Sequence, residues 1–314
     1  MSGQDKPRYG GSARAKSVVF ISAAACIAAA VAGCSSSKGS ASQSAANVGK
    51  ADATLAAMLP DNVRKSGVIR VASELDYAPV EYLDTDGKTP IGAELEVGTA
   101  VADRLGVRLK ITNLAFDPTI PAINANRFDT SMTYIGDKVE RQAQVDFVDV
   151  FRSGYSVMVR KGNPKHINGL ADLCGVRVSV QIGAANTAVV QDQSKACVAA
   201  GKPAVQMSET KDAAGALLQL KSDRVDAHLE DAPVAAQTAK VSGGGKDFEV
   251  VGKQVTIRNH GWIFRKADTK LRDAMQAGLK AIIADGTYGK ILDKWGLQSI
   301  SLTTASVNDA TITN

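Results

Sequence analysis

Short segments rich in β-branched residues alternate with helical patterns along most of this chain, and this alternation constrains its fold more than any other feature. In one of the helical patterns, Val97, Val101 and Leu105 recur at four-residue steps on one face, and Gly106 follows where a helix C-terminal glycine belongs. The first half of the chain predicts strands at 68–72, 108–112 and 128–133, and helices at 94–105 and 119–125. This alternation is typical of an α/β fold, in which mostly parallel sheets are flanked by helices.

A second set of strands and helices follows the break at Lys161-Gly162-Asn163-Pro164. It predicts strands at 176–180, 204–207, 227–229 and 261–264, and helices at 187–199, 213–221, 268–285 and 287–295. A surface turn is expected at 242–245, where three glycines follow a serine. A chain of 314 residues is long enough for two domains of common size.

Composition and charge argue against several classes of function. Hydrophobic residues make up 45% of the chain and charged residues 22%, which is ordinary for a globular protein. The net charge is +5, but residues 1–33 hold four basic residues and one acidic residue, so the remainder carries only +2. No Lys/Arg cluster occurs in that remainder, and we expect no nucleic-acid partner. The three histidines, His166, His228 and His260, lie far apart, and we expect no metal and no cofactor.

The N-terminal segment has the features of a secretion signal. A basic, polar start is followed by an apolar run at 18–32, which is short for a membrane span, and then by Val31-Ala32-Gly33-Cys34, which resembles a bacterial lipobox. We therefore predict a lipoprotein signal peptide at 1–33, lipidation of Cys34, and a flexible tether rich in Ser, Ala and Gly at 34–54. The alternative is a secretory peptide cut nearby, with Cys34 left as a free thiol.

The remaining cysteines fit an extracytoplasmic compartment. Cys26 lies inside the predicted signal peptide, which leaves Cys174 and Cys197 as a pair in the body of the chain. Outside the cytoplasm such a pair usually forms a disulfide, which here would hold a local β–α unit together. Two buried free thiols are the alternative.

Several sequence blocks, taken in their order, resemble a known family. The blocks are Ile91-Gly92-Ala93-Glu94-Leu95-Glu96, Arg104-Leu105-Gly106-Val107, Phe116 with Ile120-Pro121-Ala122-Ile123, Arg127-Phe128-Asp129, and Glu140-Arg141 followed by Val145-Asp146-Phe147. Their order and spacing resemble the polar-amino-acid family (family 3) of bacterial extracellular solute-binding proteins. The resemblance runs from about Val68 to Gly296.

The resemblance implies a two-lobed, type II periplasmic-binding-protein fold, with a mostly parallel sheet and flanking helices in each lobe and a hinge of two strands. Residues near 55–155 and 257–314 would form the first lobe, and residues near 156–256 the second. The lobes would close around a small amino-acid-like ligand, and the permease subunits of an ABC importer would read that closure. We expect a monomeric binding protein, not an enzyme, anchored at the extracytoplasmic face of the membrane through Cys34.

Two charged residues match the ligand-binding positions of this family. Arg141 matches the arginine that holds the ligand α-carboxylate, a task suited to a planar guanidinium with parallel donors. Asp231 matches the aspartate, just past a strand, that takes the ligand ammonium. The alternatives are a surface arginine that opens a helix and an aspartate that caps the next helix; one aspartate can serve both roles.

Other positions match the walls of the ligand cleft. Tyr77 and Phe116 fall where the family has aromatic walls, although Phe116 could equally be a core residue. Glu74 matches an acid that faces the ligand side chain in some relatives, and hints at a basic or amide ligand. Gln181 and Ala185, with Gly183 between them, occupy a loop whose backbone N–H groups can meet a carboxylate. Tyr134 and Gly136 lie where relatives often carry a small residue and then a hydroxyl, so Tyr134 would narrow the cleft or contact the ligand.

Two further functions fit the same features. The fold occasionally supports dehydratase or cell-wall-cleaving chemistry, and Glu74, Glu230 and Asp231 could form a general acid and base pair. No nucleophile motif or cofactor loop supports that interpretation. The third possibility is the ligand-sensing component of a receptor, which would bind its ligand without import.

Overall fold

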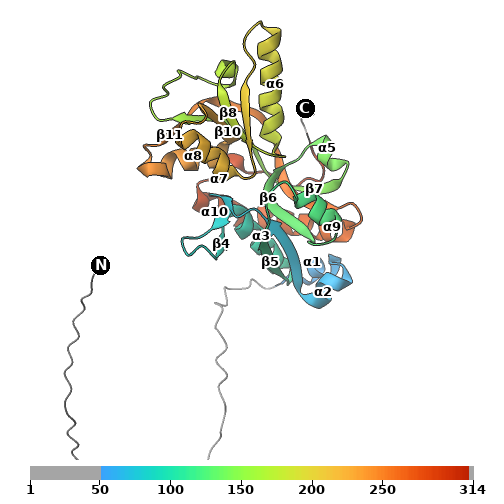
Figure 1. Cartoon of the computed structure of the whole chain (residues 1–314). Coiled ribbons are helices and arrows are strands. Elements are labelled where there is room, and N and C mark those ends of the chain that lie inside the picture. The colour runs from blue at the N-terminus through green and yellow to red at the C-terminus, as the bar shows by residue number, and fades with distance from the viewer. Residues whose placement is uncertain (1–50, 311–314) are drawn as a thin grey trace, which may run out of the picture. The chain divides into compact units, whose positions relative to one another are not determined.

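The computed structural model describes residues 51–310 (Figure 1). Two long antiparallel strands, β7 (Val145–Arg160) and β11 (Phe248–Arg265), lie at the centre of an eight-stranded sheet of order β5-β1-β6-β11-β7-β10-β8-β9. On one side of this pair lie β6 (Thr130–Gly136), β1 (Val68–Ser73) and β5 (Arg108–Asn113). On the other side lie β10 (Ala227–Asp231), β8 (Arg177–Gln181) and β9 (Gln206–Thr210).

The strands outside the central pair are parallel to one another. β1 pairs in parallel with both β5 and β6, and β8 pairs in parallel with both β10 and β9. The central pair meets its neighbours in the antiparallel sense, β11 against β6 and β7 against β10. Each end of the sheet is thus a parallel β–α unit of the predicted kind, and the central pair connects the two units.

Helices cover both units. The first unit carries α3 (Ala93–Leu105), α9 (Thr269–Ala284) and α10 (Thr287–Trp295), which pack on one another, with α1 (Ala53–Met58), α2 (Asp61–Ser66), α4 (Thr119–Asn124) and α5 (Val139–Gln142). The second carries α6 (Ala185–Ala199), α7 (Ala213–Lys221) and α8 (Ala232–Val241). A small separate sheet joins β2 (Asp76–Tyr77), β3 (Glu81–Leu83) and β4 (Pro90–Ile91). Short 3-10 turns occur at Leu170–Leu173, Ser242–Gly244 and Gln298–Ile300.

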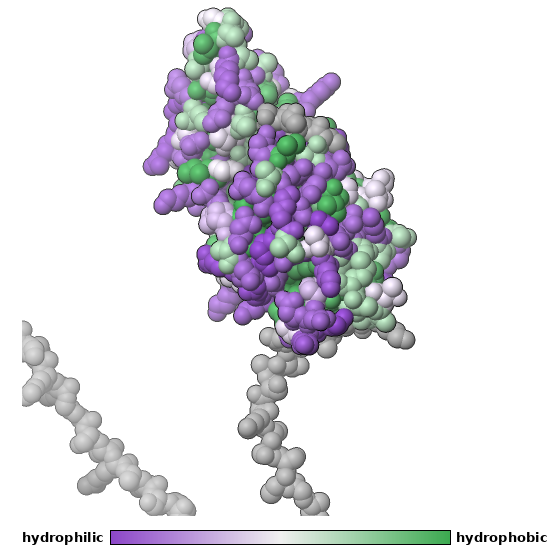
Figure 2. Space-filling model, turned by 90° about the vertical axis from the view of Figure 1, so that its right-hand side faces the viewer, coloured by the Kyte–Doolittle hydropathy of each residue, from purple (hydrophilic) through white to green (hydrophobic). Residues whose placement is uncertain are grey.

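Each unit has an apolar core of its own, which makes the described chain two-lobed. Ile69, Met132, Trp262 and Leu279 are buried in the first lobe, and Leu173, Val178, Val190 and Leu229 in the second. Burying such side chains is the main favourable contribution to folding. On the face that Figure 2 shows, hydrophilic side chains prevail and apolar ones are interspersed among them. None of the described helices is long and apolar enough to span a bilayer.

The predicted elements agree with the structure to different degrees. The helices at 213–221 and 287–295 begin and end as predicted, and the other predicted helices differ by one or two residues at their ends. The predicted strand at 261–264 is only the end of β11, and β7, α1, α2, α5, α8 and the small sheet were not predicted. α1 begins at Ala53, and Asp52 caps it by accepting a hydrogen bond from the Thr54 N–H, so the last residues of the predicted tether are structured. Cys34 and the signal peptide lie outside the described residues.

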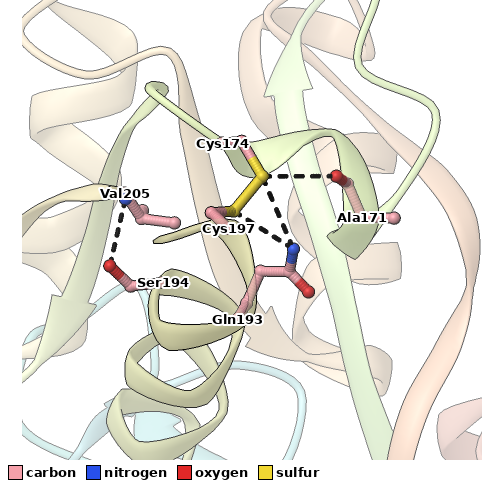
Figure 3. Close-up of a disulfide and its surroundings, with 6 residues drawn as sticks. All are labelled: Ala171, Cys174, Gln193, Ser194, Cys197 and Val205. Atoms are coloured by element: carbon pink, nitrogen blue, oxygen red, sulfur yellow. Dashed lines mark hydrogen bonds between the residues drawn. A yellow bond between two sulfur atoms is a disulfide. The ribbon is translucent and has the colours of Figure 1, made fainter. Parts of the chain in front are cut away.

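A disulfide joins Cys174 and Cys197 (Figure 3). Cys174 follows the 3-10 turn that precedes β8, and Cys197 lies near the end of α6. The amide nitrogen of Gln193, one turn before Cys197 on α6, lies 3.4 Å from the Cys197 sulfur. The bond therefore ties the start of a strand to the helix that follows it, as predicted.

Candidate ligand-binding site

A cavity lies between the two lobes, with about 370 Å³ of space inside it when the solvent at its mouth is included. It is lined by Glu74, Tyr77, Glu81, Phe116, Thr133, Tyr134, Gly136, Arg141, Tyr155, Gln181, Ala184, Ala185, Asn186, Asp231 and His260. All nine predicted ligand-contacting residues are among them. The structure thus brings together side chains that come from opposite lobes and lie far apart in the sequence.

Arg141 is a buried cation held by both lobes. It lies on α5 with 9% of its surface exposed, which rules out the alternative of a surface arginine. Its guanidinium donates to the Gly136 carbonyl and, across the cleft, to the Gly183 carbonyl, each at 2.8 Å, and lies over the ring of Phe116. Burial lowers the pKa of Arg141 to about 10. The contacts of its guanidinium within residues 51–310 are two carbonyl oxygens and a ring, none of which is charged, so its charge is available to an anion.

The start of α6 faces the same part of the cavity. Ala184, Ala185 and Asn186 line the wall there, and no side chain caps the helix. The first backbone N–H groups of a helix lack intrahelical partners, and the helix dipole adds positive charge at this end. Because Arg141 donates to Gly183, which precedes this helix, the two positive features are adjacent. Together they suit a carboxylate.

Asp231 lies on the second lobe at the end of β10, and it is also the N-cap residue of α8. Its side chain makes no capping hydrogen bond; instead Oδ2 accepts a hydrogen bond from the Tyr77 hydroxyl at 2.7 Å. Oδ1 is buried and accepts no hydrogen bond from the described residues. A buried carboxylate oxygen without a donor is costly, which makes Oδ1 a site for a cationic donor in the cavity.

Glu230 supports Asp231 from the neighbouring position. Its carboxylate accepts a hydrogen bond from the backbone N–H of Asp231 at 2.8 Å, and it shares the single proton of the Tyr77 hydroxyl with Asp231. His228 lies 3.0 Å from its other oxygen. Tyr77, on the first lobe, therefore contacts two carboxylates of the second lobe, so its role exceeds that of an aromatic wall.

Buried acids form a further part of the cavity wall. Glu74 accepts a hydrogen bond from the Gln181 side chain at 2.8 Å, and burial followed by repulsion from Asp76 raises the pKa of Glu74 to about 7. Glu81 is fully buried, and burial with the neighbouring Glu94 raises its pKa well above the usual range. Burial also raises the pKa of Glu94 to about 7, although its carboxylate accepts a hydrogen bond from the Tyr134 N–H. Such a concentration of acids suits a cationic group.

Tyr134 fills the position where a small residue was expected. Its ring stacks on His260 with the centroids 4.3 Å apart, and its hydroxyl hydrogen-bonds to the Ser153 hydroxyl at 2.9 Å. Tyr134 therefore narrows the cavity at the side of the central strands. Gly136 is also tightly placed, because a Cβ there would lie 3.1 Å from Arg258 Cδ. Phe116 has both of its expected roles, since it lines the cavity and packs against a core cluster of the first lobe.

Sequence reasoning missed six of the lining residues: Glu81, Thr133, Tyr155, Ala184, Asn186 and His260. Glu81 lies on a strand of three residues, and His260 directly follows the polar Arg258 and Asn259 on β11, so neither has a distinctive local pattern. Thr133 and Asn186 stand beside predicted residues but carry no distinctive pattern. Tyr155 lies on β7, which was not predicted as a strand.

Several known proteins are similar to this chain in sequence and in structure. The chain is 28% identical to the arginine-binding protein ArgT of Corynebacterium glutamicum over 81% of this chain and 82% of that protein. It is 28% identical to the L-cystine-binding protein TcyA of Bacillus subtilis over 76% and 85%. The solved structure of an ancestral arginine-binding protein bound to glutamine has 32% identity and a TM-score of 0.67, covering 74% of this chain and 98% of that one.

These relatives are named as binding proteins and not as enzymes. The model of one family matches residues 69–298, which is most of the chain. The chain therefore belongs to the bacterial extracellular solute-binding proteins, family 3.

Proposed function

We propose that this protein captures an amino acid with a cationic side chain between its lobes and delivers it to an ABC importer. The observation that supports this most is that Arg141 and Asp231, from opposite lobes, line one cavity. A guanidinium beside a helix start suits an α-carboxylate, and a carboxylate oxygen without a donor suits an α-ammonium. The α-amino acid backbone carries these two groups on the same carbon.

The acids of the first lobe indicate the side chain of the ligand. Glu74 and Glu81 line the cavity, and Glu94 lies behind Glu81. A guanidinium or ammonium would supply a positive charge and hydrogen-bond donors to these acids, of which Glu81 Oε2 and Glu94 Oε1 accept no hydrogen bond within residues 51–310. The relatives that bind arginine agree with this assignment, and L-arginine is the first ligand to test.

Lobe closure would carry the signal. Hydrogen bonds cross the cleft from Tyr77 to Asp231, from Gln181 to Glu74, and from Arg141 to Gly183. A ligand that contacts both lobes favours the state in which these bonds form, so its binding energy selects closure. We assign residues near 55–155 and 257–314 to the first lobe and residues near 156–256 to the second.

Delivery requires the protein to stay near its permease. We propose that Cys34, after removal of residues 1–33, carries a lipid anchor at the extracytoplasmic face of the membrane. Replacing Cys34 with serine should release the protein from the membrane fraction. A Cys34→Ser protein that remains bound to the membrane would contradict the anchor but not the binding site.

A thermal-shift screen of the standard amino acids tests the binding function, because a ligand bound only by the folded state raises the melting temperature. L-Arginine or L-lysine should give the largest rise. Mass spectrometry of the ligand released from the complex should recover it unchanged, since we propose binding without turnover. If no amino acid raises the melting temperature, the proposed function is wrong.

A further inference from the structure

His260 is a cavity residue to which no role has so far been assigned. It lies on β11, where it pairs with Gly136 of β6 and Phe151 of β7, and only 1% of its surface is exposed. Its ring is stacked on Tyr134 with an angle of 18° between the planes. The stack and the two flanking strands hold the imidazole in one orientation at the wall of the cavity.

The ring nitrogens of His260 have no hydrogen bond within residues 51–310. Nε2 lies 3.1 Å from Asp231 Oδ1, but the two groups do not have the geometry of a hydrogen bond, and Oδ1 is likewise without a donor. A buried polar atom without a partner is costly. The atoms without a partner are Nδ1 and Nε2 of His260 and Oδ1 of Asp231. Because both residues line the cavity, these atoms indicate that a group of the ligand forms hydrogen bonds there.

The chemistry of these atoms identifies that group. The Tyr77 hydroxyl already donates a hydrogen bond to Asp231 Oδ2, so Oδ1 is the oxygen of this carboxylate that has no donor. An ammonium has three N–H donors and is best held by several acceptors, and a neutral imidazole supplies one. We propose that His260 contacts the ligand, accepts a hydrogen bond from its α-amino group beside Asp231, and so favours amines over other groups at this position. This inference rests on the proposed function, which places the ammonium at Asp231.

The other histidines cannot take this role. His228 is buried, but Nδ1 is bonded to the Ser179 carbonyl and Nε2 to Glu230. His166 lies on the surface. His260 is therefore the histidine of the described chain that both lines the cavity and has an unused ring nitrogen.

The experiment measures the Kd of L-arginine, and of the analogue in which a hydroxyl replaces the α-amino group, by calorimetry at pH 8. His260→Phe keeps a ring on Tyr134 without the acceptor, and His260→Gln keeps a side-chain acceptor without the ring. His166→Gln is the matched surface control. His260→Phe should weaken arginine binding by about tenfold or more, and His260→Gln by less. The preference for the amine over the hydroxyl analogue should fall in His260→Phe.

Melting temperatures of the ligand-free variants test that each one folds. Wild-type affinity and selectivity in both His260 variants would overturn the role of His260 alone. If the wild type binds no amino acid, the proposed function fails, and this inference fails with it.

Discussion

The two sides of the cavity differ in what they bring to a ligand. The first lobe supplies large or charged side chains, among them Glu74, Glu81, Phe116 and Arg141. The second lobe supplies the start of α6 and two polar contacts of note, Gln181 and Asp231. In the proposed function the first lobe therefore supplies the acids for the ligand side chain and the guanidinium for its carboxylate, and the second lobe supplies the partner of its ammonium.

The largest loss of arginine affinity should come from replacing Arg141. Arg141→Ala removes the buried guanidinium that donates to both lobes, and with it the partner of the ligand carboxylate. We expect arginine affinity to fall by about a hundredfold or more, since hydrogen bonds to charged groups are the strong ones. Arg127→Ala is the control, because Arg127 also lies over a phenylalanine ring but is exposed and outside the cavity. Calorimetry that finds equal affinities in both variants would refute the carboxylate site.

The second lobe has its own test in Asp231→Asn, which keeps the shape of the side chain and removes its charge. Arginine binding should weaken by about ten- to a hundredfold, because the ammonium loses its counter-charge. Asp226→Asn is matched to it, since Asp226 lies next to the same strand but pairs with Arg177 away from the cavity. Asp226→Asn should leave the Kd unchanged; a comparable loss in both variants would mean that the effect is structural.

The pH dependence of arginine binding tests the acids of the first lobe. The pKa of Glu74 is raised to about 7, so Glu74 is largely neutral at pH 6 and largely ionised at pH 8. A cationic side chain binds the ionised form, so affinity should rise by up to about tenfold between pH 6 and pH 8, with release of a proton on binding near pH 7. Glu74→Gln should reduce this rise, and proton release is measured by calorimetry in buffers of different ionisation enthalpy. An equal rise in Glu74→Gln would remove Glu74 from the ligand site.

The smallest effect on binding should follow from the disulfide, which lies in the second lobe at a distance from the lining residues. Replacing both Cys174 and Cys197 with serine should lower the free energy of unfolding by about 2–4 kcal/mol, mainly because the unfolded chain gains freedom. Urea unfolding measures this loss. The Kd for arginine should stay within about twofold of the wild type, and a larger change would mean that the disulfide shapes the cavity.

Sequence patterns predicted the helices better than the central strands. α7 and α10 were placed to the residue because their apolar spacing and flanking residues mark both ends. β7 is buried on both faces along most of its length, so it has no polar alternation to reveal a strand. β11 runs from one lobe to the other, and its residues are largely exposed or half-buried in the first part and buried in the last part. A short sequence window covers only one of these parts, so it predicts only a fragment of the strand.

Prediction of the residues of the binding site from the sequence was limited in the same way. Arg141 and Asp231 could be predicted because each lies within a block that resembles the family. His260 and Glu81 could not, since what distinguishes them is burial beside partners far away in the chain: His260 beside Asp231 and Tyr134, and Glu81 beside Glu94. Proximity of this kind is a property of the fold and leaves no local pattern in the sequence.

The claim that one amino acid is held by its carboxylate in one lobe and its ammonium in the other can be tested directly by calorimetric titration with L-arginine and two blocked derivatives, the carboxyl amide and the N-acetyl compound. We predict one-to-one binding of L-arginine and a loss of about a hundredfold or more for either derivative. If both derivatives bind as tightly as L-arginine, the ligand is not held between Arg141 and Asp231, and the account is wrong.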